Sequence, residues 1–143
     1  MQKVRLLFVD DEFDIISSFK LSFRKEAQSE TFTFHFAQSA DEALTLVAQT
    51  VTPFDVIVTD LNMPDKTGFD LLAALNEQKT KSLLYVCSTY DQATYIEKAK
   101  ALGVAGFFKK PIMINTIKKQ LQQDLLLRLG VELPFRFIPD PHG

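Results

Sequence analysis

Four charged side chains stand at the ends of short apolar runs in this sequence. Asp10 and Asp11 end the run LLFVDD, Asp60 ends FDVIVTD, and Lys110 stands in AGFFKKP just before Pro111. Each run is typical of a buried strand. If these strands lie parallel in one sheet, all four side chains emerge at the same edge. Carboxylates gathered there repel one another unless a cation lies among them, so the pattern predicts metal-assisted phosphate chemistry.

The bulk composition indicates one globular domain without an unusual charge. At 143 residues, with a net charge of −2 and 46% hydrophobic residues, the chain can bury a proper core. No Lys/Arg run resembles a nucleic-acid arm, and no apolar stretch could span a bilayer or form a signal peptide. The lone Cys87 lies inside the apolar run LLYVC, as a reduced core thiol would. We therefore expect a cytoplasmic protein that contacts neither nucleic acid nor membrane.

Short apolar runs alternate with segments of helical period along the whole chain. The expected strands are Val4–Val9, Thr31–Ala37, Phe54–Thr59, Leu83–Cys87 and Ala105–Lys109. The expected helices are Phe13–Ala27, Ala40–Gln49, Phe69–Gln78, Asp91–Leu102 and Ile114–Leu129. Five such units predict an α/β fold in which helices cover both faces of a parallel sheet.

Local signals refine several of these elements. Residues 31–37 alternate between apolar and more polar side chains, which indicates a half-exposed strand at a sheet edge. Ser39 precedes Glu42 by three residues, which predicts a capping box at the start of a helix. Gly103 predicts the end of the fourth helix. Met113 cannot cap the last helix, although Asn115 offers a cap slightly later.

The topology of such a sheet predicts where a ligand binds. In open α/β sheets, ligands lie beyond the carboxyl ends of the strands, where the winding direction changes. This rule gathers five side chains around one crevice: Asp10, Asp11, Asp60, Ser88 and Lys110. Adjacent strand residues face opposite ways, so only one lysine of FFKKP reaches the crevice, and the following proline favours Lys110 over Lys109.

Taken together, these motifs resemble the receiver domain of two-component response regulators. The resemblance extends from about Lys3 to about Leu126 and rests on VDDE, TDLNMP followed by Gly68, YVCSTYD and FFKKP. Each motif is weak alone, but their order and spacing together are specific. The resemblance implies a flavodoxin-like (βα)5 fold whose parallel sheet has the strand order 2-1-3-4-5. It also implies a receiver domain over residues 1–129 and a tail or linker over residues 130–143.

The resemblance further implies how the acidic residues divide their roles. Asp60 corresponds to the phosphoacceptor, which forms an acyl phosphate. Asp11 corresponds to a direct ligand of Mg²⁺, and Asp10 to a residue that helps to hold the ion. Asp60 and the backbone carbonyl of Asn62 would complete the metal site, because Mg²⁺ takes oxygen ligands.

Other positions correspond to the switch of the family. Ser88 matches the hydroxyl that binds the phosphoryl group, Lys110 the ammonium that contacts it, and Phe107 the rotating aromatic residue, although a plain core role for Phe107 stays open. The Lys110–Pro111 bond is expected to be cis. Thr89 competes with Ser88 for the switch role. It is also larger than the usual residue, and we expect its branched side chain to slow phosphorylation and hydrolysis.

The predicted function is a phosphorylation-controlled receiver. A sensor histidine kinase or phosphotransfer protein would donate the phosphoryl group, and the switched surface would control a partner or output domain. Such a domain assists its own phosphorylation and hydrolysis but is a signalling module and not an enzyme. The alternative is a docking module of the same fold that acts without phosphorylation. A flavin- or nucleotide-binding protein is less favoured, because no Gly-rich phosphate loop follows the first strand.

The carboxyl-terminal part of the sequence leaves two alternatives open. Four leucines, at 125, 126, 127 and 129, cover more than one face of the last helix. Either the segment VELPFRFIP packs back onto the domain, or the leucines form a surface for a dimer or a further domain. A homodimer could use this helix or the face of the fourth helix, fifth strand and fifth helix. A stand-alone regulator and the first domain of a longer protein are both compatible with the sequence.

Overall fold

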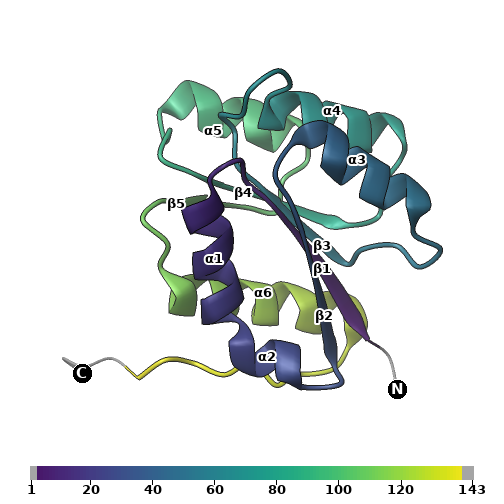
Figure 1. The fold of residues 1–143 in the computed structure, drawn as a ribbon, viewed down its shortest axis with the longest axis vertical. Helices are drawn as coiled ribbons and strands as arrows, with labels where there is room; N and C mark the ends of the chain where they lie inside the picture. Colours follow the sequence, from purple (N-terminus) through teal and green to yellow (C-terminus); the bar gives the residue numbers. More distant parts are fainter. Residues whose placement is uncertain (1–2, 140–143) are drawn as a thin grey trace.

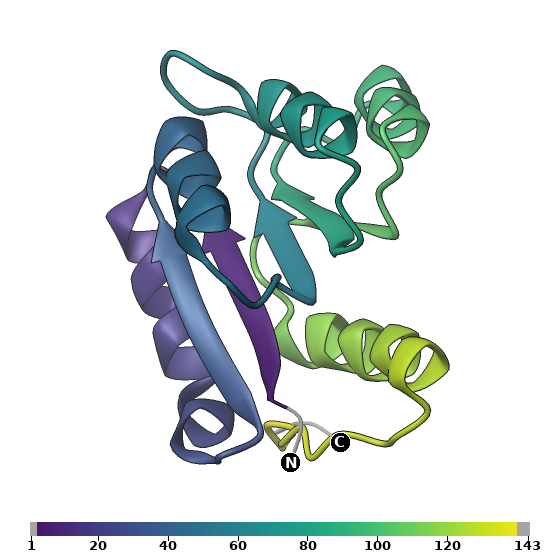
Figure 2. The ribbon, with the colours of Figure 1, turned by 90° about the vertical axis from the view of Figure 1, so that its right-hand side faces the viewer.

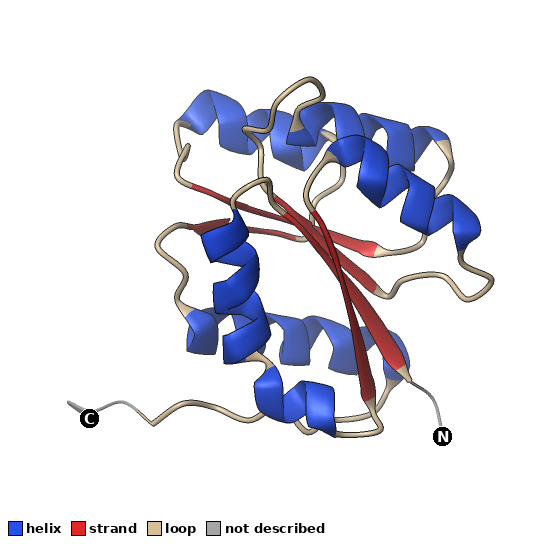
Figure 3. Ribbon diagram, in the orientation of Figure 1, coloured by secondary structure: helices blue, strands red, loops and turns tan. Residues whose placement is uncertain are grey.

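The computed structural model describes residues 3–139, which form a parallel sheet between two layers of helices (Figures 1 and 3). The strands are β1 (Val4–Val9), β2 (Phe32–Ala37), β3 (Val56–Thr59), β4 (Leu83–Ser88) and β5 (Gly106–Lys109). The helices are α1 (Phe13–Ser22), α2 (Arg24–Gln28), α3 (Ala40–Gln49), α4 (Gly68–Glu77), α5 (Ala93–Ala101) and α6 (Ile114–Leu129). In this part of the chain, no helix is long and apolar enough to cross a membrane.

The sheet has the order β2-β1-β3-β4-β5, and every neighbouring pair is parallel. The predicted flavodoxin-like order 2-1-3-4-5 is therefore confirmed. All four residues of the central strand β3 are buried, as its continuous apolar run predicts. The edge strand β2 is only partly buried along its middle, in agreement with its alternating sequence.

Two apolar cores lie on opposite faces of the sheet, and successive residues of β1 supply them in turn. Leu6 and Phe8 enter the core covered by α1 and α6, whereas Leu7 and Val9 enter the core covered by α3, α4 and α5. Figure 2 shows these two helical layers on either side of the sheet. This alternation is the period of a strand buried on both faces.

The single helix predicted over residues 13–27 is wrong. Phe23 leaves helical dihedrals, with φ −103° and ψ 17°, and separates α1 from the short α2. The ring of Phe23 is buried 5.2 Å from that of Phe8. The change of direction also turns Glu26 inward, where its carboxylate lies 2.9 Å from the ammonium of Lys118. The helical period of residues 13–27 cannot report this contact, because Glu26 and Lys118 are far apart in the sequence.

Helix ends agree with the sequence in part. Ser39 Oγ accepts from the backbone N–H of Glu42 at 3.0 Å, so the predicted cap is present. The Glu42 carboxylate, however, accepts from Gln38 and not from Ser39, so the capping box is incomplete. A full capping box joins Thr67 and Asp70 at the start of α4, and the spacing of the two residues in TGFD is the local signal for it. Gly103 follows the end of α5 at φ +83°, as predicted.

Residues 131–139 pack back onto the domain. Leu133 and Phe135 are buried in the core of the α1 and α6 face, and the Phe135 ring lies 4.8 Å from that of Phe32. Leu125 is buried, whereas Leu126 and Leu127 are exposed. Packing of the tail therefore accounts for part of the leucine-rich surface. The domain boundary at residue 129 stays a prediction, although core residues lie beyond it.

Candidate functional site

The carboxyl edge of the sheet is built by hydrogen bonds that continue the strand ladder past each strand. At three positions the backbone N–H donates to a carbonyl of a neighbouring strand: Asp10 to Ala37 at 3.0 Å, Asp60 to Val9 at 2.9 Å and Lys110 to Ser88 at 2.9 Å. These bonds fix where each strand ends and hence where the next side chain emerges. The structure therefore brings together the acids and the lysine that the strand ends predicted.

A buried ion-pair cluster lies at this edge. Lys110 Nζ is 2.6 Å from Asp10 Oδ2 and 3.5 Å from Asp60 Oδ2. The three residues are only 7%, 1% and 5% exposed. Asp60 Oδ1 accepts from the backbone N–H of Leu61 at 2.8 Å, and Asp10 Oδ1 accepts from that of Glu12 at 2.9 Å. Each carboxylate is thus held in place with one oxygen near the ammonium.

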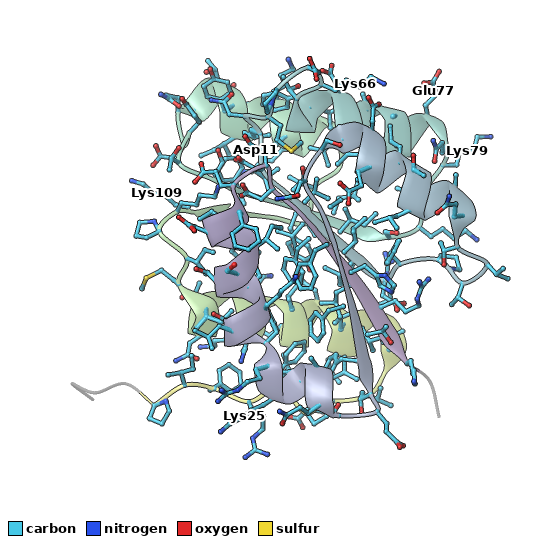
Figure 4. The ribbon with its side chains drawn as sticks, viewed as in Figure 1. Asp11, Lys25, Lys66, Glu77, Lys79 and Lys109 are labelled. Atoms are coloured by element: carbon cyan, nitrogen blue, oxygen red, sulfur yellow. The ribbon has the colours of Figure 1, made fainter. Side chains whose placement is uncertain are left out.

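Asp11 and Glu12 add further negative charge beside this cluster. One oxygen each from Asp10, Asp11 and Glu12 lies within 4.8 Å of the others. Asp11 Oδ1 is buried and has no hydrogen-bond partner among residues 3–139. Figure 4 places Asp11 in the loop between β1 and α1. A hard cation fits this donor set, because it accepts several carboxylate oxygens and relieves their repulsion. Glu12 was missed by sequence reasoning, although it is the third acid of VDDE.

Burial and charge shift the ionisation of the cluster. Burial raises the pKa of Asp60 above its usual value; Lys110 opposes this shift and the charge of Asp10 adds to it. Burial would lower the pKa of Lys110, but its hydrogen bond to Asp10 and the charges of Asp60 and Asp10 outweigh this and raise the pKa. One ammonium pairs with Asp10 and Asp60, while Asp11 and Glu12 lie beside Asp10, so the carboxylates of the crevice outnumber its ammonium.

Gly68 allows the loop that follows β3 to close tightly. Its N–H donates to the carbonyl of Leu61 at 2.9 Å, and an added Cβ would lie 2.0 Å from the carbonyl oxygen of Asp60. No side chain fits at that distance, which explains why the motif TDLNMP needs this glycine. Asn62 is exposed on the same loop, and the metal role of its carbonyl stays a prediction.

The two candidate switch hydroxyls differ in burial. Ser88 is fully buried at the end of β4, and its Oγ accepts from the N–H of Tyr90 at 3.1 Å. Thr89 is exposed. Phe107 is half-buried and packs against the core of the α3, α4 and α5 face. The switch roles of Ser88 and Phe107, like the kinetic role of Thr89, stay predictions.

The lysine pair of FFKKP points two ways. Lys109 is exposed and lies 3.1 Å from Asp91, whereas Lys110 enters the crevice. The Lys110–Pro111 peptide bond is cis. Cys87 is buried beside the crevice, and burial raises the pKa of its thiol to about 12, so it is an unreactive core residue.

Comparison with known proteins agrees with this fold. The family model of the response regulator receiver domain matches residues 6–122. The chain is 35% identical to chemotaxis protein CheY-3 of Vibrio cholerae over 94 residues, which are 63% of this chain and 72% of CheY-3. It is 26% identical to response regulator protein PilR of Pseudomonas aeruginosa over 129 residues, which are 90% of this chain but only 27% of PilR.

Solved structures show the same architecture. The signal receiver domain of an HD domain-containing protein from Pseudomonas fluorescens aligns with a TM-score of 0.80 at 22% identity, over 91% of this chain and 100% of that chain. CheY4 of Vibrio cholerae aligns with a TM-score of 0.75 at 27% identity, over 85% of this chain and 98% of that chain. A CheX–CheY complex of Borrelia burgdorferi, which contains BeF3 and Mg²⁺, aligns with a TM-score of 0.78 at 18% identity, over 87% of this chain and 90% of that chain.

A parallel sheet of this order, with an acidic crevice at its carboxyl edge, defines a flavodoxin-like receiver fold. The chain belongs to the response regulator receiver domain family, which makes it a module of two-component signalling rather than a classical enzyme.

Proposed function

We propose that this chain takes a phosphoryl group onto Asp60 from a phosphohistidine of a sensor histidine kinase or phosphotransfer protein. One observation carries the proposal: the buried Asp60 carboxylate lies 3.5 Å from Lys110 Nζ in a crevice with surplus negative charge. A carboxylate is a poor nucleophile toward a dianionic donor, because both are negative. The crevice therefore needs a cation beside the attacking oxygen, and we assign Asp10 and Asp11 to hold it.

The residues of the crevice have distinct parts in the proposed transfer. Asp60 Oδ2 bonds to phosphorus while the P–N bond of the donor breaks, and the imidazole leaves and regains a proton from solvent. The Leu61 N–H holds Oδ1, and Lys110 stabilises charge on the transferring oxygens. Bound Mg²⁺ would screen the repulsion between carboxylate and donor, with Asp11 and the carbonyl of Asn62 as further ligands.

The switch follows from a new hydrogen bond to the phosphoryl group. Ser88 Oγ accepts from the N–H of Tyr90, and a hydroxyl can donate at the same time, so its O–H is available to donate to a phosphoryl group on Asp60. We propose that this contact shifts Phe107 and the surface of α5, β5 and α6 that a partner or a second copy would bind. A ligand moves such an equilibrium only by its differential affinity for the two states.

The direct test is labelling with acetyl phosphate followed by intact-mass measurement. The wild type is expected to gain one phosphoryl group in the presence of Mg²⁺ and none with excess EDTA. Asp60→Asn removes the nucleophile and is expected to abolish labelling, whereas the exposed Asp14→Asn is the matched control and is expected to label normally. Labelling that persists in Asp60→Asn would refute the assignment. A wild type that is never labelled would favour the phosphorylation-independent docking module.

A further inference from the structure

Residues 131–139 form an extended segment, here named the strap, that is fixed to α6 at both ends. Near its start, the carbonyl of Leu133 accepts from Gln122 Nε2 at 3.0 Å. Near its end, Asn115 binds both backbone groups of Ile138, at 2.7 and 2.9 Å. The sequence suggested Asn115 as a cap of α6. In the structure its side chain binds the strap instead.

A buried ion pair fixes the middle of the strap. Glu26 of α2 and Lys118 of α6 lie 2.9 Å apart and are almost fully buried. The N–H of Arg136 donates to Glu26 Oε2 at 2.7 Å, and the carbonyl of Arg136 accepts from Lys118 Nζ at 2.6 Å. Because both backbone groups of Arg136 are used inward, its exposed side chain has a defined place at the surface.

The strap completes a cavity of about 290 Å³ at its junction with α1 and α2. The lining residues are Leu21, Ser22, Arg24, Lys25, Lys118, Arg136, Phe137, Ile138 and Pro139. Four of them are cationic and none is acidic. Lys118 is neutralised by Glu26, but within the described part of the chain Arg24, Lys25 and Arg136 form no ion pair. This local excess of positive charge stands against a net charge of −2 for the chain.

Exposed apolar side chains accompany these cations. Leu21 is 70% exposed, and Phe137 and Ile138 are each nearly half exposed. Large apolar side chains with a charged rim mark interaction sites more often than scattered exposed residues do. Lys25 and Asp11 lie at opposite ends of the α1–α2 segment in Figure 4, so this surface is separate from the phosphoacceptor crevice.

We propose that this cavity, named the strap pocket, binds an acidic segment of a partner protein that carries a large apolar anchor residue. Carboxylates would face Arg24, Lys25 and Arg136, and the anchor would enter between Leu21 and Phe137. A concave cavity of this size suits one or two side chains, whereas a bilayer presents a broad surface that cannot enter it. A protein segment therefore fits the shape as well as the charge.

The test is NMR titration of the ¹⁵N-labelled full chain with a synthetic peptide of Glu residues around a central Leu-Phe pair. The amide chemical shifts of residues around the strap pocket are expected to change on titration. The same peptide with Lys in place of Glu is expected not to bind. The double variant Arg24→Glu/Lys25→Glu is expected to weaken binding by about tenfold or more. Lys79→Glu/Lys81→Glu changes the net charge equally at a different basic hollow and is the matched control, expected to bind normally.

A second variant tests the role of the strap in peptide binding without changing any charge. Asn115→Ala removes the two hydrogen bonds to Ile138 and is expected to weaken binding of the peptide. Labelling by acetyl phosphate and the NMR spectrum of the folded protein are expected to stay as in the wild type. The proposal is overturned if the peptide does not bind, if its shifts spread over other faces, or if the Arg24 and Lys25 reversals leave binding unchanged. Sedimentation with phosphatidylglycerol vesicles, but no peptide binding, would assign the surface to membranes instead.

Discussion

Two buried lysines in this protein have similar partners and different surroundings. Lys110 lies 2.6 Å from Asp10 at the carboxyl edge of the sheet, and Lys118 lies 2.9 Å from Glu26 under the strap. Both are almost completely buried. Each region also contains one buried carboxylate oxygen with no partner among residues 3–139, in Asp11 and in Glu26. Neither burial nor an unpaired oxygen therefore distinguishes the crevice at the sheet edge from the ion pair under the strap.

Charge balance does distinguish them. Lys118 meets one carboxylate, and the backbone of Arg136 closes the pair from the strap side. Lys110 meets Asp10 and Asp60 directly, with Asp11 and Glu12 nearby, so the carboxylates outnumber it. A balanced, closed pair fixes a structure, whereas an unbalanced cluster of carboxylates at a sheet edge attracts a cation.

The largest effect is expected from breaking the balanced pair. Lys118→Met leaves the Glu26 carboxylate buried without its counter-ion, which typically costs about 3–5 kcal/mol of unfolding free energy. Urea denaturation measures this loss, and the exposed neighbour Lys119→Met is expected to change stability by less than about 0.5 kcal/mol. Adding Glu26→Leu to Lys118→Met removes the unpaired charge and is expected to restore part of the stability, because the backbone groups of Arg136 still lack their partners. If the single variant is as stable as the wild type, Lys118 does not hold the strap.

A glycine in each region sharpens the contrast further. Gly68→Ala forces a Cβ against the Asp60 carbonyl, so we expect a loss of about 1–3 kcal/mol together with slower acetyl phosphate labelling. Gly130, the residue between α6 and the strap, has φ +75° and open space around its Cβ position. Gly130→Ala is therefore expected to lose about 1–2 kcal/mol through backbone strain alone and to label normally. Equal labelling rates in the two variants would contradict the role given to Gly68.

The smallest effect is a pH dependence that comes from Asp60. Its pKa is raised by burial, so between the ordinary value of 3.8 and the raised value the folded chain binds more protons than the unfolded chain. The contribution of Asp60 to folding stability is therefore fully present below pH 3.8 and is lost as the pH rises through the raised pKa. Asp60→Asn lacks this loss, so its stability relative to the wild type is expected to increase with pH across that window. Urea unfolding of both proteins as a function of pH measures the difference, and a constant difference would contradict a raised pKa.

Sequence patterns predicted the sheet and the crevice well because both depend on short-range signals. Continuous apolar runs define β1 and β3, alternation defines β2, and topology rules then place the strand ends at one edge. Asp10, Asp60 and Lys110 lie where those rules put them. The break at Phe23 and the place of Asn115 were not predictable in this way. They depend on Glu26 meeting Lys118 and on Asn115 meeting Ile138, contacts between residues far apart in the chain.

Mg²⁺ binding measured by isothermal titration calorimetry tests the central claim most directly. The unbalanced crevice is expected to bind one Mg²⁺ per chain, and Asp11→Asn, which removes one charge from the donor set, is expected to weaken binding by about tenfold or more. Asp14→Asn, at an exposed position in the first turn of α1, is the control and is expected to bind as the wild type does. A wild type that binds no Mg²⁺, or an Asp11→Asn variant that binds it equally well, would contradict the account.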